Sequence, residues 1–311
     1  MDLRPLGGSG LTTPRLVLGG NVFGFTAKGE EAFRLLDRFA EAGGTMIDTA
    51  DVYSKWVPGH VGGESETMLG EWLKRRGGKK GVLIATKVGY DAGLSAAEIE
   101  RAAEASLARL GIDEIDLYYA HKDDSKTPLE ESLAAFDRLV RAGKVRALGA
   151  SNFDASRLAA ALDLQESVGL ARYEVLQPEY NLMARDGFEG PLQQLCIERG
   201  LGVLPYFGLA SGFLTGKYRS EADFGKSVRG DRMGAYLNDQ GRAVLAALDE
   251  VAAETGASPA QVALAWLAAQ PGVTAPIASA TSLAQLEELL GVLSLELSAV
   301  QVARLSEASA P

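Results

Sequence analysis

The sequence predicts an α/β fold, a closed (β/α)8 barrel of the TIM type, and three observations support this prediction. Eight short β-rich runs alternate with helical patterns along the whole chain. Several of these runs, such as residues 82–85, are unbroken apolar stretches, which are typical of strands covered on both faces. No change of composition divides the 311 residues, so we expect one domain over residues 1–311.

The predicted barrel begins with a hairpin and continues as eight strands. Residues 3–11 place a Gly-Gly-Ser-Gly turn between apolar residues, which predicts a β-hairpin that closes the bottom of the barrel. A doubly wound open sheet is the rival fold, but the turn after the first strand, residues 21–25, lacks the G-x-G-x-x-G pattern of that fold. The strands are expected, in chain order, at residues 15–20, 45–50, 82–88, 115–121, 145–151, 173–177, 202–207 and 273–279.

Capping signals mark the helices between these strands. Ser95 and Glu98 read as a capping box, with Gly111 as the stop of that helix. Thr127 is expected to cap the next helix, with Pro128 at its first position. Further helices are expected to begin at residues 152–154 and 258–259.

A long loop is expected after the seventh strand. The interval between the last two strands is more than twice as long as the other strand–helix units. It holds residues 208–239, which are rich in Gly and polar residues, and then two helical patterns. Long loops at this face of a barrel more often carry functional residues than serve only as connections.

Composition and charge exclude several classes of protein. Lys and Arg number 31 against 41 Asp and Glu, a net charge of −10, so the chain lacks the basic excess of a nucleic-acid binder. One Cys excludes an internal disulfide and a cysteine-based zinc site, and two His argue against a multi-histidine metal centre, so no metal is expected. The chain shows no targeting segment and no run of 18 apolar residues, so we expect a cytoplasmic protein with no membrane partner.

Polar residues stand where the predicted strands end. Each of them alone is more often a helix cap, a solvated side chain or a packed core residue. Because the carboxyl ends of barrel strands converge on one pocket, the set as a whole indicates a site. Its members are Asp48, Lys87, His121, Ser151, Asn152, Gln177 and Tyr206, with Tyr53 just after the second strand.

The chemistry of this set suits reduction of a carbonyl. A phenol with a pKa near ~10 is a poor acid, and the ammonium of Lys87 beside Tyr53 is expected to lower that pKa. Asp48 would hold the lysine charged, and His121 would hydrogen-bond a carbonyl oxygen. Hydride then arrives at the carbonyl carbon while Tyr53 protonates the oxygen.

Six segments together resemble the aldo-keto reductase superfamily, in order and spacing, over essentially the whole chain. They are Thr-Met-Ile-Asp-Thr-Ala-Asp-Val-Tyr at 45–53, Ala-Thr-Lys at 85–87, Asp-Leu-Tyr-Tyr-Ala-His at 116–121, Gly-Ala-Ser-Asn-Phe at 149–153, Gln-Pro-Glu-Tyr-Asn at 177–181 and Gly-Phe-Leu-Thr-Gly-Lys-Tyr at 212–218. The resemblance implies a (β/α)8 barrel that binds NAD(P)(H) without a Rossmann fold. It also implies that Tyr53 is the general acid and base, Lys87 and Asp48 its tuning pair, and His121 the substrate-orienting partner.

The resemblance further assigns residues to the cofactor. Ser151, Asn152 and Gln177 would hold the nicotinamide carboxamide, and Tyr206 would stack on the ring. The stretch 209–217 would lie along the pyrophosphate, and the stretch after the eighth strand would lie near the adenosine. The candidates in these two stretches are Leu209, Gly212, Leu214, Lys217, Ser279, Thr281, Gln285 and Glu288.

The composition of the stretch after the eighth strand modestly favours NAD(H) over NADP(H) as the cofactor. Relatives that prefer NADPH usually place Lys or Arg there to pair the 2′-phosphate. Here no Lys or Arg occurs between Arg242 and Arg304. Basic residues of the long loop are the alternative phosphate partners, namely Lys217, Lys226, Arg229 and Arg232.

Three residues are weaker candidates for contacts with the substrate, a small carbonyl compound or sugar. Trp56 follows Tyr53 in the loop 54–63, where it either lines the pocket or packs on the rim. Asn21 and Phe23 lie at the mouth of the first strand, where pocket lining and simple packing are both reasonable.

Two other functions remain open beside the oxidoreductase. A nicotinamide-binding regulatory or redox-sensing subunit with slow turnover, like potassium-channel β subunits, can keep the same four residues. A lyase or aldolase with Lys87 as a Schiff base needs a neutral lysine, and the pairing with Asp48 predicts the opposite. The sequence also leaves the substrate, the preferred direction and the oligomeric state open.

Overall fold

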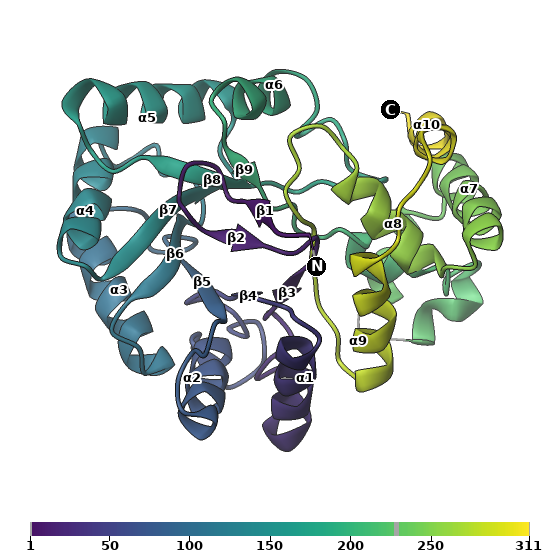
Figure 1. The fold of residues 1–311 in the computed structure, drawn as a ribbon, viewed down its shortest axis with the longest axis horizontal. Helices are drawn as coiled ribbons and strands as arrows, with labels where there is room; N and C mark the ends of the chain where they lie inside the picture. The colour runs from purple at the N-terminus through teal and green to yellow at the C-terminus, as the bar shows by residue number, and fades with distance from the viewer. Residues whose placement is uncertain (1, 227–229, 311) are drawn as a thin grey trace.

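Eight parallel strands form a closed barrel in the computed structural model, which describes residues 2–226 and 230–310 (Figure 1). The strand order is β10-β3-β4-β5-β6-β7-β8-β9. The ring closes where the Thr274 and Ile277 amides donate to the carbonyls of Val203 and Pro205, at 2.8 and 2.9 Å. The prediction of a (β/α)8 barrel is confirmed.

The barrel strands lie within the predicted runs, although several are shorter. β9 stops early because Pro205 has no N–H to donate to the ladder, and β10 begins only after Pro276 for the same reason. The strands are β3 (Val17–Gly19), β4 (Met46–Asp48), β5 (Leu83–Val88), β6 (Ile115–Ala120), β7 (Val145–Ser151), β8 (Tyr173–Gln177), β9 (Gly202–Val203) and β10 (Ile277–Ala278).

Helices cover the outside of the barrel (Figure 1). The Ser95 hydroxyl accepts the Glu98 amide, and Gly111 ends that helix in the left-handed region, as expected. The expected cap at Thr127 is wrong, because its hydroxyl donates to Asp124 at 2.7 Å and the helix starts after Pro128. The helices are α1 (Gly29–Glu41), α2 (Glu64–Arg76), α3 (Ala96–Leu110), α4 (Leu129–Arg141), α5 (Ala155–Val168), α6 (Pro191–Glu198), α7 (Asp239–Thr255), α8 (Pro259–Ala268), α9 (Leu283–Leu290) and α10 (Ala299–Ala308).

The N-terminal hairpin lies across one end of the barrel (Figure 1). Its strands are β1 (Arg4–Pro5) and β2 (Thr12–Thr13), paired antiparallel. Between them, Leu6 and Leu11 are buried in the small cluster inside the barrel, together with inward-facing residues of the parallel strands. The hairpin therefore plugs the end opposite the strands' carboxyl termini, as expected.

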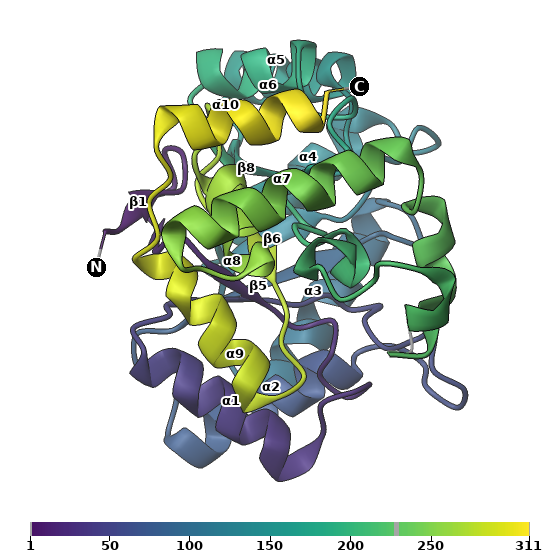
Figure 2. The same cartoon turned by 90° about the vertical axis from the view of Figure 1, so that its right-hand side faces the viewer.

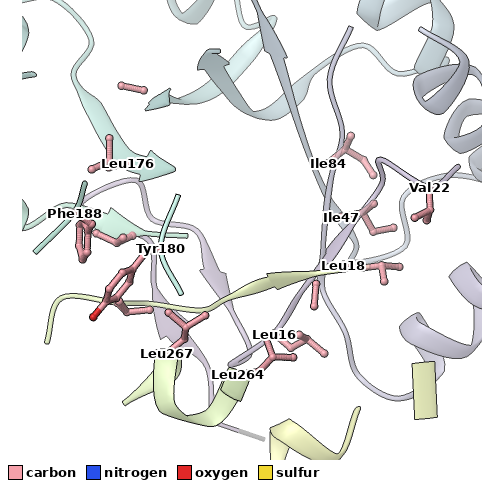
Figure 3. Packing of buried hydrophobic residues seen from close by; sticks show 14 of the residues in the cluster. Leu16, Leu18, Val22, Ile47, Ile84, Leu176, Tyr180, Phe188, Leu264 and Leu267 are labelled. Atoms are coloured by element: carbon pink, nitrogen blue, oxygen red, sulfur yellow. The ribbon is translucent and has the colours of Figure 1, made fainter. Parts of the chain in front are cut away.

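A second and larger cluster of buried residues lies between the strands and the helices. Leu18, Ile47 and Ile84 are register partners on β3, β4 and β5, and all three belong to this cluster. Figure 3 shows these side chains near one another. Because successive residues of a strand point to opposite faces, the residues next to them point into the barrel.

The long loop after β9 includes, in its described residues 208–226 and 230–239, three short 3-10 helices, η1 (Ala210–Thr215), η2 (Glu221–Lys226) and η3 (Gly230–Ala235). α7 and α10 pack against each other outside the ring (Figure 2). Within the described ranges, no helix is both long enough and apolar enough to cross a membrane.

A buried carboxylate at the start of β6 links three elements. Asp116 is fully buried and accepts the Ile84 amide at 2.9 Å, Lys79 Nζ at 2.9 Å and Arg146 Nη1 at 2.8 Å. We expect Asp116→Ala to lower the free energy of unfolding by about 1–3 kcal/mol, because it leaves the buried Ile84 amide without its acceptor. Urea denaturation measures the change.

The exposed pair of Asp163 and Arg199 supplies the control. Asp163→Ala is expected to cost at most about 1 kcal/mol, because exposed ion pairs contribute little. Equal losses in the Asp116 and Asp163 variants would contradict this account of the buried carboxylate.

Candidate active site

Strand geometry directs three candidate side chains into the barrel. Met46, Ala85 and Val175 belong to the cluster inside the barrel. Two residues further along the same strands come Asp48, Lys87 and Gln177, which therefore share that inward face at the carboxyl ends. All three are at least 98% buried.

Lys87 lies at the centre of the site. Its Nζ donates to Asp48 Oδ2 and to the Thr49 carbonyl, each at 2.7 Å, and to Tyr53 Oη at 3.0 Å. Burial lowers the pKa of this lysine, and the carboxylate of Asp48 opposes that lowering. Three acceptors around one nitrogen match the three N–H donors of an ammonium, an arrangement that disfavours a Schiff-base role.

Tyr53 lies at hydrogen-bond distance from both charged partners. Its hydroxyl donates to Asp48 Oδ2 at 3.3 Å and accepts from Lys87. Burial raises the pKa of this phenol well above its usual value, and the nearby Asp48 carboxylate raises it further. The expected lowering by Lys87 is thus wrong for this structure, because burial and Asp48 outweigh the ammonium. The phenol is a neutral donor.

His121 follows β6 and lies beside Tyr53. The ring centroids of Tyr53 and His121 are 6.1 Å apart, and those of Tyr90 and His121 are 4.9 Å apart. Burial, and then the charge of Lys87, lower the pKa of His121 to about 2. The imidazole is therefore neutral near pH 7, and it can donate a single hydrogen bond.

A second group of hydrogen bonds joins the candidate carboxamide-binding residues to this cluster. Gln177 Nε2 donates to Asp48 Oδ1 at 2.8 Å, and Ser151 Oγ donates to the Gln177 carbonyl at 2.8 Å. Asn152 Nδ2 donates to the His121 carbonyl at 2.9 Å, and its Oδ1 accepts the Tyr206 hydroxyl at 2.7 Å. The structure thus brings these strand-end residues into one network.

The start of the long loop has an unusual backbone. Phe207, Ala210 and Ser211 have positive φ angles of 55°, 46° and 57°. Non-glycine residues with such angles are strained, and they concentrate at functional sites. Gly212 follows in the same region at 102°.

The candidate residues of this loop differ in what they expose. Leu214 is fully buried and so offers only backbone to a ligand, whereas Leu209 packs against the core but is only partly buried. Lys217 Nζ lies 3.7 Å from the position of a Cβ on Gly212, which places an ammonium beside the turn. Of the loop's other basic residues, Arg229 lies outside the described residues.

The stretch after β10 borders the same end of the barrel. Ser279 Oγ donates to Asn21 Oδ1 at 2.9 Å, which joins the ends of β10 and β3. The Thr281 amide and hydroxyl both donate to Gln285 Oε1, at 2.8 and 3.0 Å. The Glu288 carbonyl accepts from Gln261 at 2.7 Å.

The candidate substrate residues separate into exposed and buried ones. Trp56 is 53% exposed, and its ring lies 6.2 Å from that of Tyr53. Phe23 is fully buried in the outer core, so its ring is a packing residue and offers no surface to a substrate. Tyr90, which is 52% exposed against His121, was missed because it lies two residues beyond the end of β5. A search for candidates among the first two residues after each strand, as well as at the strand ends, would have found Tyr90.

No group of three or more His, Cys, Asp or Glu side chains that could hold a metal ion occurs in the described part of the chain. The side chains gathered at this site are a phenol, an ammonium, a carboxylate and an imidazole.

Sequence comparisons match the chain to known proteins over most of its length. The Aldo/keto reductase family matches residues 15–310. An aldo-keto reductase of Schizosaccharomyces pombe, whose name specifies NADP(+), is 32% identical over 88% of this chain and 81% of its own length. A norsolorinic acid reductase of Emericella nidulans is 34% identical over 86% and 69%, respectively. A probable voltage-gated potassium channel subunit beta of Arabidopsis thaliana is 31% identical over 93% and 90%.

Proposed function

Because the chain belongs to the aldo/keto reductase family, we propose that it is an NAD(P)-dependent oxidoreductase with Tyr53 as general acid and base. It transfers a hydride between a nicotinamide cofactor and a carbonyl or alcohol of an aldehyde, ketone or sugar. The family match over residues 15–310 also supports the expectation that the whole chain acts as one catalytic domain.

The residues at the mouth of the barrel fit a nicotinamide cofactor. Ser151, Asn152 and Gln177 carry hydroxyl and amide groups of the kind that bind a carboxamide, and the Tyr206 ring lies beside Asn152, to which its hydroxyl donates. The positive-φ turn and the Lys217 ammonium suit the negative charge of a pyrophosphate. When bound there, the reduced cofactor supplies a hydride to the carbonyl carbon.

The protein's own part in this reaction is a proton transfer to the carbonyl oxygen. Tyr53 is the donor, because its raised pKa keeps the phenol protonated. As the proton leaves, Lys87 at 3.0 Å stabilises the phenolate that forms, and Asp48 holds the ammonium in place. His121, which is neutral, orients the carbonyl oxygen by a hydrogen bond.

The observation that carries this proposal is the contact of one buried ammonium with both Asp48 and Tyr53. The test is oxidation of NADH or NADPH, followed by absorbance, with a panel of aldehydes, ketones and sugars. We expect oxidation that depends on the carbonyl compound. Cofactor binding is measured separately, by the quenching of protein fluorescence on addition of NADH or NADPH, because Tyr206 and Trp56 lie near the proposed site. If neither NADH nor NADPH binds, the proposal is contradicted.

A modest preference for NAD(H) stays part of the proposal, although the name of the Schizosaccharomyces pombe relative specifies NADP(+). Its support is the lack of any Lys or Arg between Arg242 and Arg304. We expect Thr281→Arg to tighten NADPH binding roughly 10-fold and to leave NADH binding unchanged, because a guanidinium pairs a 2′-phosphate that NADH lacks. Titration of both cofactors against wild type measures this.

Thr281→Gln is the matched control, because it also introduces a longer polar side chain but adds no positive charge. No gain in NADPH affinity for the arginine variant would mean that the phosphate lies elsewhere, for example near Lys217 or Lys226 in the long loop.

A second candidate function is a nicotinamide-binding regulatory or sensing subunit. The similarity to the Arabidopsis protein named as a channel subunit supports it. A regulatory subunit of this kind is expected to bind cofactor tightly and complete few turnovers, so the turnover number separates the two functions.

A further inference from the structure

The first turn of α2 contacts the barrel strands from the outside. Ser65 and Glu66 in this turn are both fully buried. Ser65 Oγ donates to the Gly20 carbonyl at 2.7 Å, just after β3, and lies 2.7 Å from Thr49 Oγ1, just after β4. Thr49 is also the residue whose carbonyl accepts from Lys87. This helix turn is thus fastened to the segment next to Asp48.

Glu66 makes the corresponding contact with β5. Its Oε1 accepts the Thr86 hydroxyl at 2.5 Å in the buried layer behind the strand. Thr86 precedes Lys87, and neighbouring residues of a strand point to opposite faces. Thr86 therefore faces the helices while Lys87 faces the site, and Glu66 holds the strand directly behind the ammonium.

Arg109 of α3 anchors the Glu66 carboxylate. Glu66 Oε2 lies 2.7 Å from Arg109 Nε and 2.6 Å from Nη2. A Cβ on Gly63, at the N-terminus of α2, would lie 2.6 Å from the Arg109 side chain, so the guanidinium fills that space closely. A buried carboxylate with two such partners has little freedom to move.

We propose that Glu66, anchored by Arg109 and acting through Thr86, is a positioning residue that sets the distance between the Lys87 ammonium and the Tyr53 hydroxyl. The inference rests on the proposed function, because it concerns the same proton-transfer site. Glu66 touches neither substrate nor cofactor in this proposal, so it acts on the reaction only through Lys87, by holding the β5 backbone at Thr86 and by its charge.

Charge supports the same assignment. Burial lowers the pKa of Lys87, and after Asp48 the carboxyl groups of Asp51 and Glu66 oppose that lowering. The other titratable groups that face the ammonium are Tyr53, Tyr119 and His121. A carboxylate behind the strand thus supports both the place and the charge of the lysine.

Thr86→Val tests the proposal most directly, because valine keeps the β-branched shape and removes only the hydroxyl. Glu66→Gln keeps an acceptor for Thr86 and removes the charge that pairs with Arg109. For each variant we expect kcat to fall by about 10- to 100-fold, as a small misplacement of a reacting group does. KM and the cofactor Kd stay unchanged.

The pH profile separates positioning from a merely structural role. Oxidation of an alcohol needs the phenolate of Tyr53, so a less well placed ammonium should raise the apparent pKa of kcat by about one unit. The double variant Thr86→Val/Glu66→Gln is expected to lose no more than the worse single variant, because both changes cut one path.

Ser106→Ala is the matched control. Ser106 Oγ accepts from the same Arg109 at 3.3 Å but lies on α3, away from β5, so its kcat and pH profile should equal those of wild type. Lower thermal stability in the Thr86 and Glu66 variants, with unchanged kcat and pH profile, would overturn the positioning role while wild-type turnover upholds the proposed function. Absence of carbonyl-dependent turnover in wild type itself would overturn both.

Discussion

Tyr53→Phe is expected to lower kcat for carbonyl reduction by roughly 10³-fold, within the range that general acid catalysis contributes. The change removes the hydroxyl that lies 3.0 Å from Lys87 and 3.3 Å from Asp48. The phenyl ring keeps its contacts with Trp56 and His121, so we expect the fold and the cofactor Kd to stay as in wild type. Steady-state kinetics beside fluorescence titration of the cofactor measure both quantities.

The pH dependence of the wild-type rate adds to this test. Tyr53 is protonated below its raised pKa, and His121 is neutral above its pKa of about 2. Neither group changes its charge across neutral pH, so the change of kcat for reduction expected there is the small one that comes from Asp51, whose pKa burial raises to about 7 and whose charge acts on Lys87. Retained turnover in Tyr53→Phe would identify a different proton donor.

Lys87→Met is expected to reduce kcat by about 10²- to 10⁴-fold, because the forming phenolate loses its ammonium. The variant also leaves the buried Asp48 carboxylate without its cation. We therefore expect the free energy of unfolding to fall by about 3–5 kcal/mol, as for other broken buried ion pairs. Kinetics and urea denaturation of the same preparation report the two losses.

The double variant Asp48→Asn/Lys87→Met separates lost activity from lost stability. Removing the unpaired carboxylate is expected to restore much of the stability. Activity should stay low, because the ammonium is still missing. A near-normal rate in Lys87→Met would contradict the tuning role of the lysine.

The parts of the site that lie on strands could be predicted from the sequence. Residues 82–85 form an apolar run that predicts the start of β5, and the alternation of side chains along the strand predicts the inward direction of Lys87. The same reasoning places Gln177 at the end of β8. A closed barrel then brings these two ends to one pocket, whatever the loops do.

Loops and energetic balances could not be predicted in this way. Phe23 and Tyr90 both lie just beyond strand ends, and the turn geometry alone decides that Phe23 is buried and Tyr90 exposed. The direction of the Tyr53 pKa shift depends on how burial and the Asp48 carboxylate, which raise this pKa, compare with the ammonium of Lys87, which lowers it, and that comparison requires distances. The contact of Glu66 with Thr86 joins residues 20 positions apart through the packing of α2 on β5.

The measurement that tests the central claim most directly is the number of turnovers per protein chain. Wild-type protein is mixed with excess NADH or NADPH and excess aldehyde, and the alcohol formed is quantified against the nicotinamide oxidised. We expect many molecules of alcohol per chain, in equal amount to the oxidised cofactor, and a rate that collapses in Tyr53→Phe. At most one alcohol per chain, or an equal rate in Tyr53→Phe, would contradict an oxidoreductase that uses Tyr53 as its acid.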